Sequence, residues 1–416
     1  MGLKTFLGQS ILCLLLLVSS YASYARKEAD SLKQVIPDAT DTFAYVRYLN
    51  TLSADLVQEG QAEQAAQYAA RALDLSRASG DEEGVAISLL NTGNAYACKG
   101  NQKKALSSFV QSLKLKSSQR SRKLSEKLYY RMAVTFARLR KYPLALKYFH
   151  KAAQQQEKYE ARYARIKGEK KALPVVPGED SLYVQDTVGD FELYDNMLEL
   201  TADDHVVVDR DTIMIDVSSD KGSRALLTAD IIDAFDDGKK AQAYGLLLHI
   251  KQPVTGKRKT FSGINTVGHM FITLTKFNTD SGYVSRTFGF YPDKDYLLSA
   301  TPLLPVSTSV FKDDEAHDWD EMVAKFISKR RFNRILRMVK RYSRRKYNLN
   351  KNNCTDFGLV VAAIAGIKIE DTRGTWPLGG GNNPADTGQS VREGKIEHLD
   401  GDDKLFVYPP PQEEGL

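Results

Sequence analysis

Cysteine is scarce in this sequence. Its 416 residues include three cysteines, whereas a small exported domain held together by disulfide bonds carries several pairs. Cys98 and Cys354 fall in different halves of the chain. We therefore expect free thiols with separate roles, with Cys98 filling a small buried position in a helix. A Cys98–Cys354 disulfide is the alternative.

The common metal-binding patterns HExxH, CxxC and the EF-hand loop are also missing. His205 lies beside Asp203 and Asp204, but the three residues lack the spacing of metal ligands. We interpret His205 as a solvated loop histidine. The sequence thus predicts a protein with no metal and no cofactor.

Long apolar runs are missing too. Ile11–Val18 (ILCLLLLV) has eight residues, and a helix needs about twenty to span a bilayer. Lys4 precedes this run, and small residues follow it, with Ser23 and Ala25 at the two recognition positions of a cleavage site. We therefore expect residues 1–25 to be a signal peptide. The mature chain would be periplasmic, at the outer surface or secreted, without a transmembrane span. An uncleaved N-terminal anchor is the alternative.

The net charge of +6 is small for this length, so charge does not indicate a nucleic-acid-binding protein. One segment stands out, because residues 329–346 hold ten basic residues and no acidic ones. Apolar residues recur there at helical spacing, which leaves the other helix face positive. We expect Lys329–Lys346 to attract an anionic envelope polymer or lipid head group. A basic face that is merely solvated is the alternative.

The first half of the chain repeats itself every forty residues. Small residues recur where two helices of a hairpin touch, and large apolar residues recur where hairpins pack on each other. The aligned positions are Ser53, Leu56, Gly60, Ala65, Ala69 and Ala72; Gly93, Tyr96, Gly100, Ala105, Phe109 and Ser112; Ala133, Phe136, Arg140, Ala145, Phe149 and Ala152.

This pattern resembles the tetratricopeptide repeat, with longer units than usual. The resemblance implies an all-α solenoid of three helical hairpins within residues 26–165. It also implies a concave face that binds a protein or peptide. The alternative is a stack that only positions the next domain or mediates self-association. Residues 166–240 would then be a linker, broken at Pro174 and Pro177, followed by a hairpin near 205–217 and a short helix at 228–242.

The second half begins with strand-like runs. Tyr244–Lys251 is apolar, and His269 opens an alternating run that is rich in β-forming residues. A turn at 278–282 leads into a second strand at Tyr283–Tyr291. These features predict an antiparallel sheet with His269 at the beginning of a strand.

Cys354 opens a run of small and apolar residues that ends at Gly366. The preceding Asn353 is a good helix cap, so we expect a buried helix over 354–365. Cys354 would lie in its first turn, where backbone N–H groups and the helix dipole favour a thiolate. A charged histidine nearby would lower the thiol pKa further and could protonate a leaving group.

The words GHMFITL, GFYP and NNCTDFGLVVAAIAG resemble the papain-like class, in which a thiol at the start of a buried helix meets a histidine on a strand. The histidine precedes the cysteine here, as in the circularly permuted branch that includes lecithin–retinol acyltransferase-like enzymes. NlpC-type peptidases have the opposite order. The resemblance implies an α+β papain-like domain over residues 241–395. It further implies Cys354 as nucleophile and His269 as base.

The residue that orients the histidine is harder to assign. Ser285, Thr287 and Tyr291 share one face of the second strand, and we choose Thr287. Asn353 and Asp356 neighbour the thiol as candidates for oxyanion binding, although Asp356 could instead cap the helix.

The sequence therefore predicts a multidomain exported protein that cleaves or transfers an amide or ester through a Cys354 thiolate, with repeats for partner binding. The alternative is a non-catalytic interaction protein with a degenerate papain-like domain. We expect residues 396–416, which are acidic and rich in proline, to form a loosely ordered tail.

Overall fold

The computed structural model describes residues 41–167, 224–261, 267–293, 299–399 and 405–410. The predicted signal peptide, the predicted hairpin near 205–217 and His205 lie outside the described residues. Within the described ranges, no helix combines the length and the hydropathy needed to cross a membrane.

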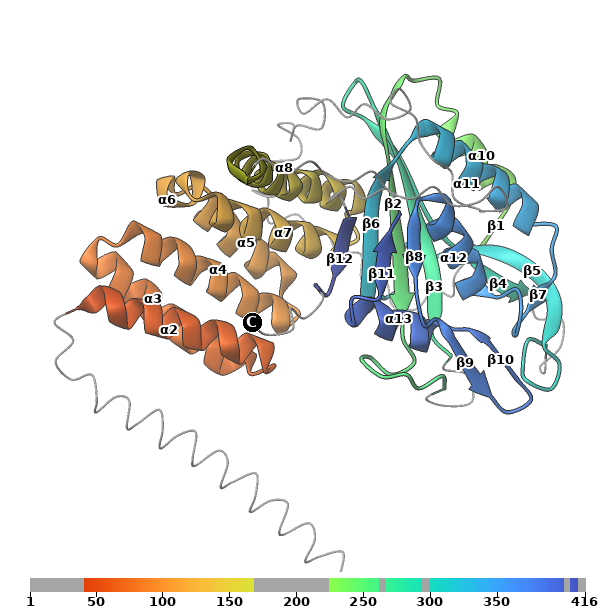
Figure 1. The fold of residues 1–416 in the computed structure, drawn as a ribbon, viewed down its shortest axis with the longest axis horizontal. Helices are drawn as coiled ribbons and strands as arrows, with labels where there is room; N and C mark the ends of the chain where they lie inside the picture. Colours follow the sequence, from red (N-terminus) through yellow and green to blue (C-terminus); the bar gives the residue numbers. More distant parts are fainter. Residues whose placement is uncertain (1–40, 168–223, 262–266, 294–298, 400–404, 411–416) are drawn as a thin grey trace, which may run out of the picture.

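Three helical hairpins form the first half (Figure 1). They are α2 (Thr42–Gln58) with α3 (Ala62–Ser79), α4 (Glu82–Cys98) with α5 (Gln102–Leu113), and α7 (Arg122–Arg138) with α8 (Tyr142–Lys167), and the short α6 (Lys116–Arg120) precedes α7. The first helices begin at residues 42, 82 and 122, so the predicted period of forty is confirmed. Gly93 shows why small residues recur, because a side chain there would overlap the Phe109 ring of the partner helix.

The turn inside each hairpin contains one residue in the left-handed backbone region. Gly60 and Gly100 have φ of 78° and 76°, and Arg140 at the same repeat position has φ of 59°. Glycine adopts this conformation freely, whereas a side chain such as that of Arg140 makes it cost about 1 kcal/mol. The third hairpin therefore keeps the turn geometry of the first two with a less favourable residue.

An eight-stranded antiparallel sheet forms the second half, in the order β1-β5-β4-β3-β2-β6-β12 with β7 beside β5. Its strands are β1 (Ala225–Leu226), β2 (Ala241–Lys251), β3 (His269–Asn278), β4 (Tyr283–Asp293), β5 (Val306–Asp313), β6 (Glu321–Ile327), β7 (Tyr347–Asn348) and β12 (Leu405–Tyr408). Side chains alternate between the two faces. Leu246 and Leu248 belong to one core cluster and Leu247 to another.

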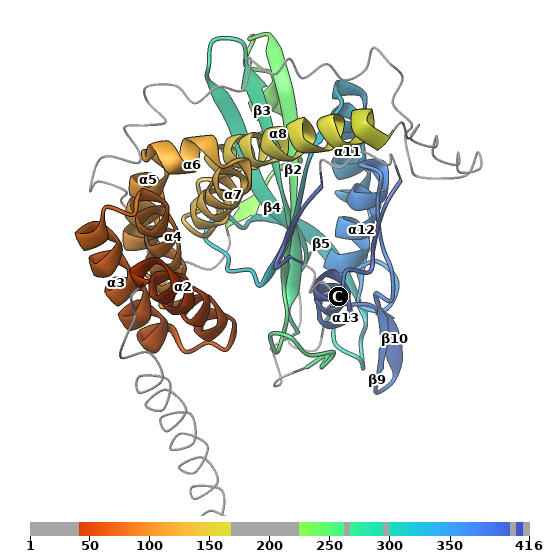
Figure 2. The ribbon, with the colours of Figure 1, turned by 60° about the vertical axis from the view of Figure 1, so that its left-hand side comes forward.

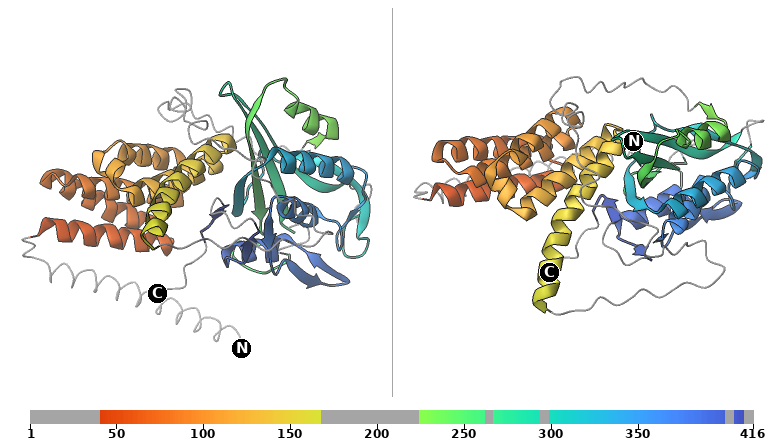
Figure 3. Two further views of the ribbon diagram at one scale, coloured as in Figure 1. Left: turned by 45° about the horizontal axis from the view of Figure 1, so that its top comes forward. Right: turned by 90° about the horizontal axis from the view of Figure 1, so that it is seen from above.

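Helices on one side of the sheet cover the Leu246 face, as Figure 3 shows from above for α11. They are α10 (Thr228–Ile232) with a following 3-10 turn (Asp233–Phe235), α11 (Lys329–Tyr342), α12 (Cys354–Ile364) and α13 (Pro384–Arg392). Two small hairpins accompany them: β9 (Arg373–Trp376) with β10 (Gly379–Asn382), and β8 (Ile367–Ile369) with β11 (Ile396–His398).

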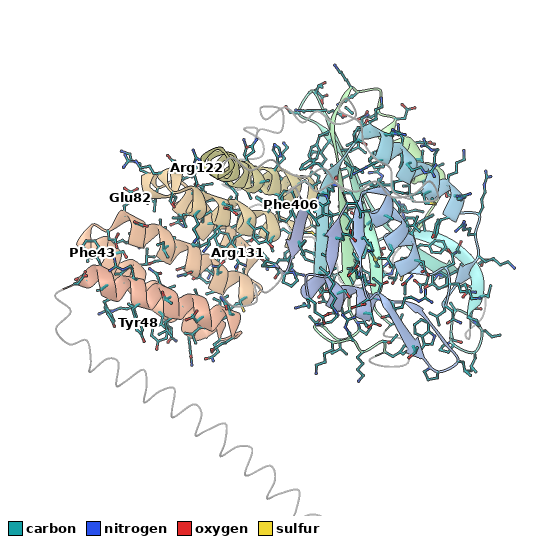
Figure 4. The ribbon with its side chains drawn as sticks, viewed as in Figure 1. Phe43, Tyr48, Glu82, Arg122, Arg131 and Phe406 are labelled. Carbon is teal, nitrogen blue, oxygen red and sulfur yellow. The ribbon has the colours of Figure 1, made fainter. Side chains whose placement is uncertain are left out.

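Two local predictions are corrected by these elements. The helix expected over 228–242 ends at Phe235, because the chain enters β2 at Ala241. The expected loose tail is wrong for residues 396–398, which pair as β11 with β8, and for residues 405–408, which pair as β12 with β6. Phe406 of β12 stacks on Phe149 of α8 with ring centroids 4.7 Å apart, and this apolar contact fixes the segment in place (Figure 4).

The third hairpin packs directly on the other sheet face, where α8 crosses the strands (Figure 2). Tyr142, Leu146 and Phe149 follow each other at helical spacing on the stripe of α8 that faces the sheet. Leu146 lies over Gly245, where any side chain would overlap it. Residues of α7, α8, β2, β3 and β6 share a single hydrophobic cluster. The repeat helices are therefore part of the core of the second half.

Candidate active site

Helix α12 places Cys354 at its first residue, as the sequence predicts. Asn353 is the N-cap, and its side-chain oxygen accepts hydrogen bonds from the N–H groups of Thr355 and Asp356. The Cys354 side chain is 7% exposed. It is free, as is Cys98. Our prediction that Cys98 is buried is wrong, because this last residue of α4 is exposed.

The side chains of Asn353 and Asp356 are fully used in holding this helix end. The Asn353 amide donates to the carbonyl oxygens of Leu349 and Asn382 at 2.9 and 2.8 Å. One Asp356 oxygen accepts from the Asn353 N–H, and the other accepts from the side chain of Asn382. These bonds leave no Asn353 amide hydrogen for a substrate oxyanion, so our expectation of oxyanion binding by the two side chains is corrected to a capping role.

His269 begins β3, and its partner is an aspartate. The His269 Nε2 and Asp314 Oδ2 atoms are 3.0 Å apart, and the Asp314 side chain is completely buried. Asp314 follows the end of β5, which pairs with β4. The Tyr291 hydroxyl donates to the other carboxylate oxygen, Asp314 Oδ1, at 2.5 Å. Gly289 leaves room for this arrangement, because a side chain there would overlap both His269 and Asp314.

Thr287 does not orient His269, so this prediction is wrong. Its hydroxyl lies 2.9 Å from that of Thr273, which lies 2.9 Å from Nε2 of a different histidine, His249. His249 is fully buried, and burial lowers its pKa to about 3, so this histidine is neutral. Thr287 therefore belongs to a structural hydrogen-bond chain under α8.

The thiol of Cys354 meets the ring of His269. Burial alone would raise the thiol pKa, but the hydrogen bond and charge of His269, the Met270 N–H and the Thr355 hydroxyl lower it. Burial alone would likewise lower the pKa of His269, but the charge and hydrogen bond of Asp314, together with Cys354, raise it to about 10. These shifts favour a thiolate paired with an imidazolium. Because Nε2 bonds Asp314, Nδ1 is the ring nitrogen left for the sulfur.

Tyr347 of β7 completes the surroundings of the sulfur. It is buried, and its hydroxyl lies close enough to Cys354 for the backbone and side chain of that residue to shift the pKa of Tyr347. Burial and the neighbouring thiol raise the pKa of Tyr347 far above its usual value, so the hydroxyl keeps its proton and can donate it to a thiolate.

A short segment between β5 and β6, residues 314–320, carries Asp314 and is held by the repeat helices. Arg138 of α7 donates to the carbonyl oxygens of Trp319 and Asp320, and its guanidinium lies 3.7 Å from the Trp319 ring centroid. His317 of the same segment lies 5.2 Å, centroid to centroid, from His269. Burial and the nearby His269 lower the pKa of His317, so it adds no charge beside the imidazolium at neutral pH.

With this geometry established, the chain can be compared with known proteins. Residues 45–118 match the tetratricopeptide repeat family. The match spans α2 to α6, so the resemblance seen in the sequence is confirmed for this part of the chain. No curated protein and no solved structure matches the chain.

The tetratricopeptide repeats form a second candidate site. The first helices of the three hairpins, α2, α4 and α7, line one groove of about 630 Å³. Phe43 at one end is half exposed, and Asn50 and Asn91 are hydrogen-bonded to each other across the floor. Repeats of this kind generally bind proteins or peptides, and the groove has apolar, amide and charged groups suited to a peptide.

Sequence reasoning brought together Cys354 and His269 and named Tyr291 beside the chosen Thr287, but it missed Asp314 and Tyr347. A buried Asp in a turn after a strand leaves no periodic signal. In the part of the chain that the structure describes, no three His, Cys, Asp or Glu side chains gather as a metal site.

Proposed function

We propose that this protein is an exported cysteine hydrolase or acyltransferase with a permuted papain-like domain, acting on an amide or ester. One observation carries the proposal: Cys354 at the start of α12 lies close enough to His269 for that ring to lower the thiol pKa, and Asp314 holds the ring at 3.0 Å. Burying the charged form of a cysteine, histidine or aspartate is costly. Three such side chains buried side by side therefore favour a functional site.

The reaction follows from the positions of these groups. The Cys354 thiolate attacks the substrate carbonyl carbon and forms a carbon–sulfur bond, while the carbonyl oxygen becomes an oxyanion beside the Cys354 N–H and Tyr347 hydroxyl. His269 transfers its proton to the leaving nitrogen or oxygen as the amide or ester bond breaks. Water, or an acceptor alcohol or amine, then loses a proton to His269 and attacks the thioester. This step releases the acid or the transferred product and restores the thiolate.

Asp314 has an electrostatic and orienting role in this scheme. It holds the ring so that one nitrogen faces the sulfur, and its charge stabilises the imidazolium. Tyr291 fixes the carboxylate in turn through its hydroxyl. The His-then-Cys order and the helix and strand that carry the two residues support the assignment to the permuted branch.

A thiol-directed electrophile tests the proposal. Iodoacetamide at pH 6 should alkylate Cys354 much faster than the exposed Cys98, and His269→Ala should remove the difference. Mass spectrometry of the two cysteine-containing peptides measures both rates in one sample. Equally slow labelling of the two thiols in the wild-type protein would contradict a catalytic site.

The second candidate function is a repeat-based interaction protein whose other domain binds without reacting. The groove along α2, α4 and α7 favours it. Peptide-library capture with Asn91→Ala as the groove variant tests this function separately. Binding through the groove together with an unreactive Cys354 would favour this second function over the enzyme.

The place of action completes the proposal. The sequence of residues 1–25 supports export, and cell fractionation of the tagged chain tests it. Nine of the ten basic residues of Lys329–Lys346 are exposed, and Arg331 is buried, donating to the Ala365 carbonyl. We therefore assign an anionic envelope polymer or lipid head group as the partner of this face, by charge complementarity.

A further inference from the structure

Several exposed apolar side chains lie close to one short segment, residues 347–352, that leads into Cys354. Leu303 and Leu304 belong to the connection from β4 to β5, Val306 is the first residue of β5, and Leu378 is at the tip of the β9–β10 hairpin. Leu303 is 66% exposed and Leu378 is 72% exposed. Half of the eight large apolar residues that are exposed in the described ranges belong to this group: Leu303, Leu304, Val306 and Leu378.

Hydrogen bonds tie these loops to the segment. Leu349 N–H donates to the Pro305 carbonyl at 2.8 Å, and Val306 of β5 pairs with Asn348 of β7. From the other side, the Trp376 indole donates to the Asn350 side chain at 3.1 Å. The two apolar loops are therefore anchored on the same six residues, and Tyr347 in that segment contacts the nucleophile.

The charge on the described part of these loops, from residue 299 of the first and residue 373 of the second, is of one sign. We call residues 299–310, 344–353 and 373–383 the rim. The rim contains no aspartate or glutamate. Its cations, all exposed, are Arg344, Arg345, Lys346, Lys351 and Arg373. Exposed apolar tips surrounded by cations without any anion are unfavourable in water and complementary to an anionic membrane surface.

We infer that the rim docks this protein on the surface of a bilayer containing anionic phospholipid. The leucines enter the boundary between head groups and acyl chains, and the five cations lie among the phosphates. A soluble polyanion would use the cations but would gain nothing from Leu303, Leu304 and Leu378. The apolar tips thus distinguish a bilayer from a polymer.

The docking itself is independent of catalysis. Its consequence, that Cys354 acts on substrates held in or at a membrane, rests on the proposed function. The segment 347–352 connects the two, because it carries Tyr347 at the thiol and supports the leucine loops on its outer side.

Sedimentation with vesicles tests the docking. The chain from Arg26, which is the mature form under the proposed export and keeps every described element, is mixed with vesicles of phosphatidylcholine alone or with phosphatidylglycerol. It should pellet with the second kind only. Each cation contributes about fivefold to partitioning, so R344Q/R345Q/K346Q should bind at least tenfold more weakly. L303N/L304N/L378N should also lose at least tenfold.

Matched controls come from the same molecule. R71Q/R77Q/R120Q removes three exposed charges from the repeat helices α3 and α6, and L227N removes a leucine that is 71% exposed on the lead-in to α10. Both should bind within about twofold of the wild type, and thermal melting checks that all variants are folded. C354A should bind like the wild type, whereas rim variants should keep fast Cys354 alkylation.

Three results would overturn the inference: no wild-type binding to anionic vesicles, an equal loss in the repeat-helix control R71Q/R77Q/R120Q, or unchanged binding in the leucine variant. The last result, with equal binding to a polyphosphate chain, would identify a soluble polymer as the partner. Vesicle binding with an unreactive Cys354 would instead contradict the proposed function and leave the docking intact.

Discussion

Asp314 Oδ2 lies 3.0 Å from His269 Nε2, and this contact places a buried carboxylate behind the histidine that faces Cys354. Removing its charge should lower the His269 pKa and with it the thiolate fraction of Cys354. In the Asp314→Asn variant we expect Cys354 to be alkylated at least about tenfold more slowly at pH 6, since each pKa unit corresponds to a tenfold change in an equilibrium.

Thr287→Val is the matched control for that variant. It removes a hydroxyl from the strand that was expected to orient the histidine, but its hydroxyl bonds Thr273 instead. We expect unchanged Cys354 alkylation with a stability loss of about 1 kcal/mol. Slow alkylation in Thr287→Val and normal alkylation in Asp314→Asn would reverse our assignment of the orienting residue.

The pH dependence of the site should be that of an ion pair. His269 lowers the pKa of Cys354, so alkylation should persist well below pH 8.5, where an ordinary thiol is about half ionised. The pKa of His269 is raised to about 10. Above that pH the imidazolium loses its proton, so turnover should fall while alkylation continues. Stopped-flow alkylation from pH 5 to 11 measures the thiolate. An alkylation midpoint at or above pH 8.5 would contradict the ion pair.

The Tyr347→Phe variant tests the effect of the hydroxyl on the thiol while keeping the aromatic ring. The hydroxyl lies close enough to the Cys354 side chain for the two groups to shift each other's pKa, and its loss removes a donor near the thiolate. We expect the alkylation midpoint to move upward, because the thiolate loses a stabilising donor. Tyr342→Phe, on α11 and also buried, should leave the midpoint in place. A shift in both variants would mean that general loosening of the core is the cause.

The repeat helices should influence the site through Arg138. Arg138→Met removes two hydrogen bonds to the carbonyls of Trp319 and Asp320 and the contact with the Trp319 ring. We expect slower Cys354 alkylation and a loss of about 2 kcal/mol in stability. Arg131→Met on the same helix is the control. Unchanged alkylation in Arg138→Met would show that the segment 314–320 holds its position without α7.

Glu321 should make stability fall as pH rises. Burial raises its pKa to about 7, despite the opposing effect of Arg392. A folded-state pKa above the unfolded value means that the folded protein binds the proton more tightly. The stabilisation that comes from the Glu321 proton is therefore fully present below about pH 4.5, and it is lost as pH rises through about 7. The change is at most about 3 kcal/mol.

Urea unfolding at pH 5 and 8 measures this change in the free energy of unfolding, and Glu321→Gln should make the two values nearly equal. The same slope in the variant would exclude Glu321 as its source.

Much of this protein follows from local sequence. Gly93 and Ala133, forty residues apart, predict hairpins because close helix contact excludes larger side chains. The strand that His269 opens and the helix that Cys354 opens follow from β-forming alternation and from the Asn353 cap. These features depend on residues a few positions apart, and hydrophobic periodicity reports such neighbours directly.

Only the tertiary structure decided which carboxylate serves the histidine and where the repeats lie. Asp314 is 45 positions from His269, and strand pairing through β4 and β5 brings the two together. Leu146 over Gly245 and Phe149 on Phe406 join α8 to the sheet in the same way. Such contacts depend on how the strands pair and which face each helix covers, and a single sequence carries no periodic signal for either.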